Sequence, residues 1–182
     1  MESGWKKEVK LKDGRIATIG FLSRRDDAGE LRNYINSFVG EKAFLLADRK
    51  YSLKEEKEWK TNTLKAMRKG GHCHLIARVD GEIAGTTDAK RGKFKEKNNV
   101  SLGIAIAKPY RGIGLGEALL GENIRIAKRR WKPRNVFLSV LAPNRPARSL
   151  YRKLGFREFA IFPKWLLHEG RYIDQVFLKL KN

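Results

Sequence analysis

The sequence predicts an α+β domain in which a central mixed, mostly antiparallel sheet of six to seven strands is flanked by about four helices. Segments with apolar residues at helical spacing alternate with short β-branched runs, in the order β-α-α-β-β-β-α-β-α-β-β. Three of these strands follow one another without an intervening helix, which is typical of an antiparallel meander. At 182 residues, the chain from 1 to 182 is expected to be one domain.

The chain is expected to start with a strand and a helix after a loosely held segment. Residues 1–12 are polar and lack apolar periodicity, so they are expected to be loosely ordered. The short apolar run 16–22 predicts the first strand. Apolar residues then recur at helical spacing over residues 28–39, and Asp26 or Asp27 in front of them is a typical helix cap.

A second helix and a β-hairpin follow. Ser52 and Glu55 have the spacing of a capping box, which predicts a helix that runs to about Lys69. Asp80 and Gly81 both tolerate the positive φ of a tight turn, so they predict a hairpin. The two strands of this hairpin are expected over residues 72–79 and 82–89.

The segment from Arg111 to Gly116 is a glycine-rich loop between a strand and a helix. The apolar run 100–107 predicts the strand, and apolar residues at spacings of four and three predict the helix 114–131. The first N–H groups of a helix lack an intrahelical partner and the dipole is positive there, so the loop suits phosphate oxygens. A plain turn is the other interpretation, since glycine also relieves crowding. Neither nucleotide-binding loop fits, because both patterns exclude Glu117 at its position.

The last part of the chain is expected to hold a strand, a short helix and two further strands. Residues 135–141 form an apolar strand pattern. Asn144 is a good cap for a short helix that Gly155 closes. The final strands are expected near residues 159–162 and 172–180.

Two motifs in this order resemble those of the GNAT superfamily of acetyl-CoA-dependent N-acetyltransferases. The family's phosphate loop, R/Q-x-x-G-x-G/A, is matched by Arg111, Gly114 and Gly116. Its second signature, N-x-x-A-x-x-L-Y-x-K-x-G-F, is matched at Asn144, Ala147, Leu150, Tyr151, Lys153, Gly155 and Phe156. The resemblance is clearest over residues 75–160, and it implies a GNAT-like single domain.

The resemblance implies an enzyme that transfers an acetyl group from acetyl-CoA to a primary amine by direct attack in a ternary complex. The acceptor would be a protein N-terminus, a lysine side chain or a small amine. In the family, the pantetheine arm of coenzyme A lies along the strand before the loop, and a main-chain N–H there faces the thioester carbonyl. The resemblance assigns cofactor binding to Ile104, Ala105, Ile106, Arg111, Gly112, Ile113, Gly114, Leu115, Gly116, Asn144 and Lys153.

The resemblance also assigns roles to individual side chains of the second motif. Tyr151 would return a proton to the thiolate, and the alternative is that its ring only packs between neighbouring leucines. Asn144 has two compatible interpretations, a helix cap and a polar contact to the pantetheine amides. Lys153 would either meet the nucleotide phosphates or remain solvated.

The general base is not assigned by the resemblance. Many relatives have a glutamate near the start of the central strand, where this chain has Ser101, and serine does not accept a proton by itself at neutral pH. Asp88 and Asp174 are the candidate bases, each acting through water, although each fits equally a carboxylate at a turn or strand edge. A water chain without either carboxylate is the default expectation.

The charge balance supports a second hypothesis. The chain has 40 basic and 20 acidic residues, a net charge of +20, and a field of this sign attracts polyanions such as coenzyme A, RNA or an acidic protein surface. Solvated lysines on an ordinary charged surface are the other explanation. The alternative function is therefore a catalytically weak or inactive GNAT-like module that binds RNA or acidic protein. The chain is expected to be a monomer or homodimer.

Other features exclude function classes. No apolar run is long enough to cross a bilayer and the N-terminus has no signal-like segment, so a cytoplasmic protein without membrane contact is expected. Cys73 is the single cysteine, which agrees with a reducing compartment. It lies between His72 and His74, but neighbours on a strand point to opposite faces, so no metal site is expected.

Overall fold

The computed structural model describes residues 5–41 and 43–181. Its α-helices are α1 (Ala28–Gly40), α2 (Leu53–Arg68), α3 (Leu115–Trp131) and α4 (Arg145–Lys153). Its strands are β1 (Lys6–Lys10), β2 (Ile16–Phe21), β3 (His72–Val79), β4 (Glu82–Arg91), β5 (Asn99–Ile106), β6 (Asn135–Leu141), β7 (Phe156–His168) and β8 (Arg171–Leu180). Short 3₁₀ turns lie at Phe94–Glu96 and Lys108–Tyr110.

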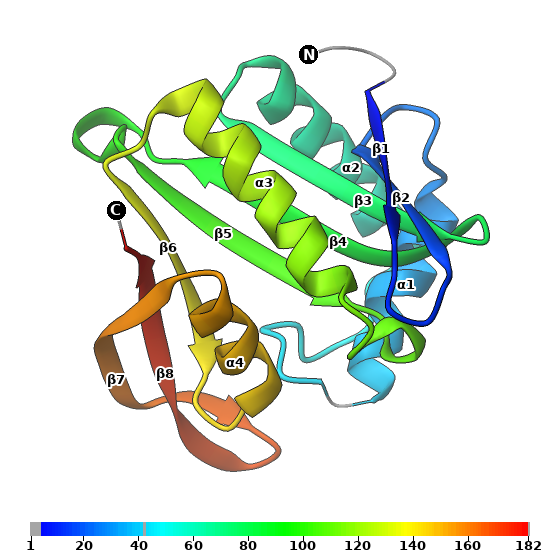
Figure 1. Ribbon diagram of the computed structural model, residues 1–182. Helices are drawn as coiled ribbons and strands as arrows, with labels where there is room; N and C mark the ends of the chain where they lie inside the picture. Colours follow the sequence, from blue (N-terminus) through cyan, green and yellow to red (C-terminus); the bar gives the residue numbers. More distant parts are fainter. Residues whose placement is uncertain (1–4, 42, 182) are drawn as a thin grey trace.

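The strands form one sheet in the order β1-β2-β3-β4-β5-β6-β8-β7 (Figure 1). All neighbours in it are antiparallel except β5 and β6, which are parallel because α3 connects them as a crossover. Helix α3 covers one face of β3, β4 and β5, and α1 and α2 cover the other face. Helix α4 packs against β7 at the C-terminal end of the chain. The predicted α+β class is confirmed, and the predicted element order is correct from β2 onwards.

Strand β1 was not expected and raises the strand number to eight. The sequence predicted loose order over residues 1–12, but Lys6–Lys10 pairs antiparallel with β2. β1 is an edge strand whose side chains are mostly exposed, so it shows no apolar alternation. Trp5 packs on Phe21 with ring centroids 5.3 Å apart, and Leu11 is buried. Residues 1–4 of the predicted loose segment lie outside the described residues.

Local capping signals were predictive. Asp27 rather than Asp26 caps α1, since its side chain accepts the Glu30 N–H at 2.9 Å. The capping box of α2 is present, with both reciprocal bonds between Ser52 and Glu55. Asn144 caps α4 by accepting the Ala147 N–H at 3.2 Å. These bonds satisfy donors that each helix start leaves unpaired, which fixes where the helices begin.

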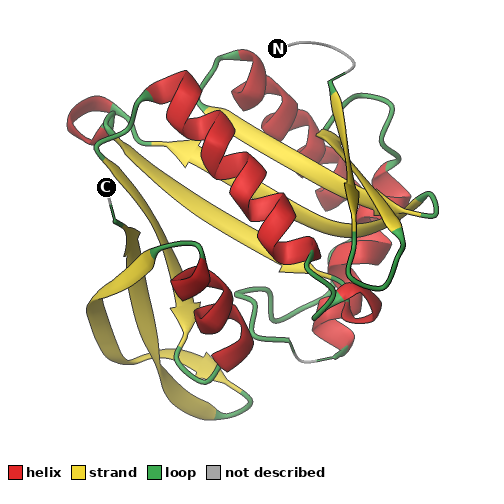
Figure 2. Cartoon of the chain, in the orientation of Figure 1, coloured by secondary structure: helices red, strands yellow, loops and turns green. Residues whose placement is uncertain are grey.

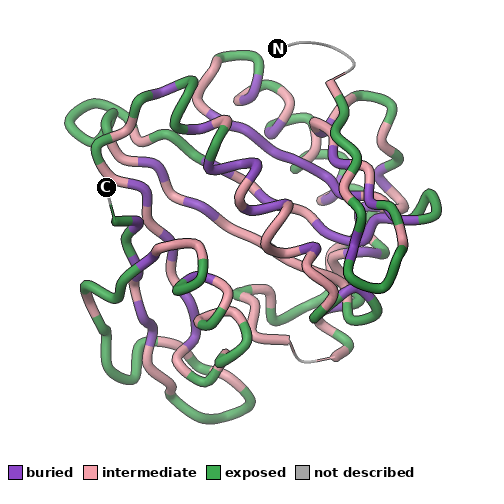
Figure 3. Tube along the Cα trace, in the orientation of Figure 1, coloured by how far each residue is buried: buried purple, intermediate pink, exposed green. Residues whose placement is uncertain are grey.

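Two apolar cores lie on the two faces of the sheet. Leu115, Leu119 and Leu120 of α3 are fully buried in the larger one. The smaller core lies under α1 and α2 and includes Phe38 and Met67. Figure 3 shows the buried positions concentrated on the central strands and the inner side of α3, while the β7–β8 hairpin is mostly exposed. No helix of the described chain combines the length and the apolar character needed to cross a bilayer.

Strand β7 is longer than its predicted range of residues 159–162. It pairs with β8 up to His168, and its register shifts at two places along the way. Many of its apolar side chains are exposed, so the alternation of a half-buried strand is absent and the sequence pattern underestimates its length.

Strands β5 and β6 diverge after a short paired region (Figure 2). Their register covers only three pairs, from Asn99↔Asn135 to Ser101↔Phe137. The Ala107 N–H donates to Ala84 O at 3.0 Å, and amide direction alternates along a strand. The amides of residues 103 and 105 therefore face β4, while those of residues 104 and 106, beyond the last pair with β6, face the gap that β6 leaves open.

Candidate active site

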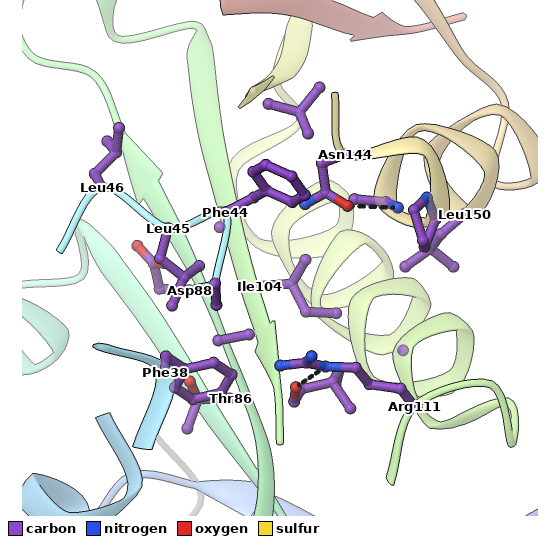
Figure 4. Close-up of a pocket in the computed structure, with 18 of the residues that line it drawn as sticks. Phe38, Phe44, Leu45, Leu46, Thr86, Asp88, Ile104, Arg111, Asn144 and Leu150 are labelled. Carbon is purple, nitrogen blue, oxygen red and sulfur yellow. Dashed lines mark hydrogen bonds between the residues drawn. The ribbon is translucent and has the colours of Figure 1, made fainter. Parts of the chain in front are cut away.

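A single large cavity of about 1140 Å³ occupies this gap and continues between the sheet and α1–α2. It is lined by the exposed side of β5, the glycine loop, α4 and the segment that connects α1 to α2. Figure 4 shows Phe44, Leu45 and Leu46 of that connection on one side, Asn144 and Leu150 on the other, and Ile104 between them. The cavity thus joins the predicted phosphate loop to the predicted acceptor region.

The glycine loop has a backbone that only glycine adopts easily. Gly112 and Gly114 have φ values of +77° and +91°, and Gly114 is the residue directly before α3. A Cβ on Gly116 would lie 3.1 Å from Leu150 Cδ2, so a side chain there would narrow the cavity. All three glycines line the cavity. The free N–H groups at the start of α3 are therefore accessible to an anion.

Two predicted loop residues contribute through the main chain only. Leu115 is fully buried in the core, and the side chain of Ile113 packs against that core. The Ile113 carbonyl accepts the Lys12 N–H at 3.0 Å, which ties the loop to the β1–β2 turn. Neither residue is among those that line the cavity.

Arg111 connects the loop to α1. Its Nε donates to Ile106 O at 2.8 Å, as Figure 4 shows by a dashed line, and its guanidinium forms an ion pair with Glu41. Its side chain also lies over the Phe38 ring, 5.7 Å from the centroid. Arg111 lines the cavity, and these contacts hold its charge where β5 ends.

Basic side chains surround the loop end of the cavity. Lys12 lies beside Gly114, 3.6 Å from the position of a Cβ there. Lys153 of α4 lines the cavity and forms an ion pair with Glu117 at 2.5 Å. Together with Arg111, these lysines give this end a positive potential that suits phosphate groups.

Tyr151 lies on α4, across the gap from β5. Its side chain is buried, and burial raises the pKa of the phenol to about 12, so the hydroxyl is protonated at neutral pH. No described residue hydrogen-bonds to this hydroxyl, and Tyr151 lines the cavity. The geometry thus leaves a protonated hydroxyl on the α4 side of the cavity. Asn144, which caps α4, also lines the cavity.

Asp88 lies on β4, directly opposite Gly103 of β5 and His74 of β3. Its Oδ2 is 3.1 Å from Lys90 Nζ and 3.5 Å from His72 Nε2. Burial by itself raises the pKa of this carboxyl, but the nearby His72 and the charge of Lys90 outweigh burial and lower it to about 2. Asp88 is therefore a fixed negative charge in the cavity and only a weak base.

Asp174, the other predicted base, lies elsewhere. Its carboxylate accepts the Lys164 N–H at 2.8 Å within the β7–β8 hairpin. It does not line the cavity. Asp174 lies opposite the register shift of β7, with its carboxylate turned towards the main chain, which agrees with the alternative interpretation of a strand-edge carboxylate.

Several residues that line the cavity were not among the predicted site residues. Tyr34 of α1 donates its hydroxyl to Ala105 O at 2.7 Å, so it supports β5 from the α1 side. Glu56 and Trp59 of α2 and His74 of β3 line the cavity beyond Asp88. The apolar spacing of α1 places Tyr34 on its buried face, and that of α2 includes Trp59, but neither pattern points to a role in a cavity.

Cys73 lies on the other face of β3 from both neighbouring histidines. It is fully buried in the core under α3, and burial raises the pKa of its thiol to about 12. The thiol is therefore protonated and outside the cavity lining, so it is not a nucleophile for chemistry in this cavity.

Comparison with known proteins gives a consistent family match. A model of the acetyltransferase (GNAT) family matches residues 40–156. The N-alpha-acetyltransferase of Sulfurisphaera tokodaii is 33% identical over 96 residues, which cover 48% of this chain and 58% of that relative. The chain thus matches less than two thirds of the relative's length.

Solved structures share the fold over most of the chain. The acetyltransferase of the GNAT family from Streptococcus pneumoniae superposes with a TM-score of 0.78 at 26% identity and covers 90% of this chain and 98% of its own. An acetyltransferase from Salmonella typhimurium, solved with its cofactor acetyl-CoA, has a TM-score of 0.78 at 23% identity, with coverages of 91% and 93%. The second likeness concerns the fold alone.

Proposed function

Because the chain belongs to the GNAT acetyltransferase family, we propose that it transfers an acetyl group from acetyl-CoA to a primary amine within a ternary complex. The observation that carries this proposal is the single cavity that joins the glycine loop, the free amides of β5, Tyr151 and Asp88. A binding protein without chemistry would not need a proton donor and a fixed carboxylate on opposite sides of one cavity.

The residues around the cavity fit coenzyme A. The glycine loop offers main-chain N–H groups without side chains in front of them, and Lys12, Arg111 and Lys153 add positive charge for the phosphates. The amides at residues 104 and 106, beyond the paired region of β5 and β6, are suited to pair with the amide groups of a pantetheine arm as an added strand would. Bound there, acetyl-CoA supplies an activated acetyl thioester.

Each side of the cavity has a task in the reaction. The Ile104 N–H is directed to donate to the carbonyl oxygen as negative charge develops there, an interaction typically worth ~3 kcal/mol. Tyr151 delivers a proton to sulfur as the carbon–sulfur bond breaks and the nitrogen–carbon bond forms. The amine nitrogen loses its proton to water, and the phenolate of Tyr151 regains one from water. Asp88 stabilises the positive charge of the arriving amine.

The acceptor is proposed to be a protein N-terminus, a lysine side chain or a small amine. The name of the Sulfurisphaera tokodaii relative, an N-alpha-acetyltransferase, supports the first of these. We place the activity in the cytoplasm, in agreement with the single free cysteine. The alternative, a module that holds RNA or acidic protein on its surface, rests on the net charge of +20.

Calorimetry with acetyl-CoA and with desulfo-CoA tests cofactor binding, and release of coenzyme A in the presence of an amine panel tests the transfer. The panel should contain peptides with free N-termini, lysine peptides and small amines. Saturable heat and amine-dependent release of coenzyme A are expected. An absence of saturable heat, together with tight, salt-sensitive RNA binding, would support the alternative.

A further inference from the structure

The charges that line the cavity are divided between its two ends. At the glycine loop, Glu41 and Glu117 line the cavity but are paired with Arg111 and Lys153, and Lys12 adds a further positive charge, whereas Glu55 and Glu56 of α2 line the part beyond Asp88. The surface as a whole carries a net charge of +20, which repels a cationic acceptor. An acidic inner end would offset this repulsion for an acceptor that has entered the cavity.

Glu56 of α2 is a mostly buried acidic residue at this inner end. It is 7% exposed, and no described residue forms a hydrogen bond or ion pair with its side chain. Its neighbour Glu55 differs, because Glu55 closes the capping box and pairs with Arg49 at 2.6 Å. Burial raises the pKa of Glu56. Burial makes the charged form of this carboxyl group unfavourable, and a cation bound in the cavity would relieve this cost.

His74 lies in the same inner end and is also without a polar partner. It is 6% exposed, and neither ring nitrogen hydrogen-bonds to any residue in the described ranges. Burial lowers the pKa of this imidazole to about 4, so the ring is neutral and offers one donor and one acceptor. The Trp59 ring meets it edge-on, with centroids 5.2 Å apart. An aromatic ring beside a carboxylate is a common environment for an ammonium group.

The sheet register fixes the distance of this inner end from the reacting centre. His74 pairs across from Asp88, and Asp88 pairs across from Gly103, which lies next to Ile104. Adjacent strands are about 4.8 Å apart, so His74 lies roughly 10 Å from β5 and about 5 Å from Asp88. A ligand that places one nitrogen at β5 and another near His74 would therefore span roughly 5–10 Å.

On the premise of the acetyl transfer proposed above, we propose that Glu56, Trp59 and His74 form a subsite for a second cationic group of the acceptor. The preferred acceptors are then primary amines with a second ammonium group roughly 5–10 Å from the reacting nitrogen. A free linear diamine has this chemistry, and so does a peptide whose N-terminal residue is lysine. In both, the second charge meets the buried carboxylate while the reacting nitrogen stays beside Asp88.

Matched acceptors test the subsite by kinetics. One pair is 1,4-diaminobutane and 1-aminobutane, and the other is a peptide that begins with lysine and the same peptide beginning with norleucine. We expect the wild-type chain to favour the doubly charged member by at least tenfold in kcat/KM, well above the statistical factor for two amino groups. The pair with the larger preference identifies the source of the acceptor.

Glu56→Gln should reduce this preference at least tenfold, mainly through KM. Glu58→Gln, on the exposed side of the same helix, is the matched control and should keep the wild-type preference. His74→Phe should reduce the preference in the same direction. A wild-type chain without preference, or a Glu56→Gln variant that keeps it, overturns the proposal.

A binding measurement separates this proposal from the proposed function. Calorimetry of 1,4-diaminobutane and of the lysine-initiated peptide into the coenzyme A-saturated chain needs no turnover. We expect at least one of the two to bind, with an affinity at least tenfold weaker for Glu56→Gln and equal to wild type for Glu58→Gln. If the chain transfers acetyl groups but Glu56→Gln binds both ligands as tightly as wild type, the subsite proposal is overturned and the proposed function is not. Diamine binding without acetyl transfer to any amine overturns the proposed function alone.

Discussion

The carboxylate of Asp88 occupies the space that a side chain on Gly103 would need. A Cβ built on Gly103 would lie 2.5 Å from Asp88 Oδ1, closer than such atoms approach in proteins. Gly103 is therefore a small residue for a reason specific to this site, since it lets a charged group of β4 lie over β5 next to Ile104.

Gly103→Ala should lower activity more than stability. The new methyl group displaces the end of a flexible side chain, so we expect kcat/KM to fall about tenfold while the free energy of unfolding changes by about 1 kcal/mol or less. Gly71→Ala is the control, because nothing lies within 4 Å of a Cβ there. Steady-state kinetics and urea denaturation of both variants measure the difference. Wild-type kinetics for Gly103→Ala would show that the position of Asp88 is unimportant.

Tyr151→Phe should lower kcat about 100-fold or more, because it removes the proposed proton donor. Its hydroxyl has no hydrogen bond to a described residue, so stability and the affinity for acetyl-CoA should stay close to wild type. Tyr172→Phe, on the exposed hairpin, is the matched control. Stopped assays of acetyl transfer measure kcat, and calorimetry measures the affinity for acetyl-CoA. If kcat is unaffected, Tyr151 serves only to pack α4.

Gly114→Asp should abolish the binding of acetyl-CoA. It places a carboxylate and a strained backbone at φ +91°, directly before the helix start that is proposed to hold phosphate. Gly170→Asp introduces similar strain at φ +75° in the β7–β8 turn, outside the cavity, and should bind normally. Calorimetry of both variants is the measurement. Equal affinities of the two variants for acetyl-CoA would show that the glycine loop is not part of the binding site.

Acid should destabilise the fold through His74. Burial lowers the pKa of His74 from its usual 6.5 to about 4, so between these values the unfolded chain binds a proton that the folded chain does not. Stability therefore falls as pH falls from 6.5 to 4, by on the order of 3 kcal/mol. In urea denaturation at several pH values, His74→Gln should make the free energy of unfolding depend less on pH. The control His168→Gln, in the β7–β8 hairpin, should show the same pH dependence as the wild-type chain. An unchanged slope in His74→Gln would contradict this account.

The sequence predicted the parts of the site that depend on local chemistry. The glycines of the loop and the Asn144 cap follow from backbone conformation and helix ends, which involve residues close in sequence. At these residues, the family motif and the requirement of the local backbone select the same residue type. The predicted order of helices and strands is correct for the same reason.

The missed parts depend on tertiary contacts. Strand β1 is held by β2 and by the packing of Trp5, not by a pattern of its own. Glu56 looks like an ordinary exposed residue of a charged helix until α2 is packed on the sheet. His74 becomes an unpaired imidazole only through its neighbours on other elements. No local pattern distinguishes these residues from surface charge or core filling.

The short pairing of β5 with β6 makes the two sides of the active site mechanically separable. The Ile104 amide belongs to β5 and Tyr151 to α4, beyond β6. Three residue pairs and the Asn135–Asn99 hydrogen bond of 2.8 Å form the seam between β5 and β6, and the Lys153–Glu117 ion pair joins α4 to α3. A displacement of about 1 Å between reacting groups costs about a hundredfold in rate. Stiffness of this seam therefore governs turnover far more strongly than it governs whether the chain stays folded.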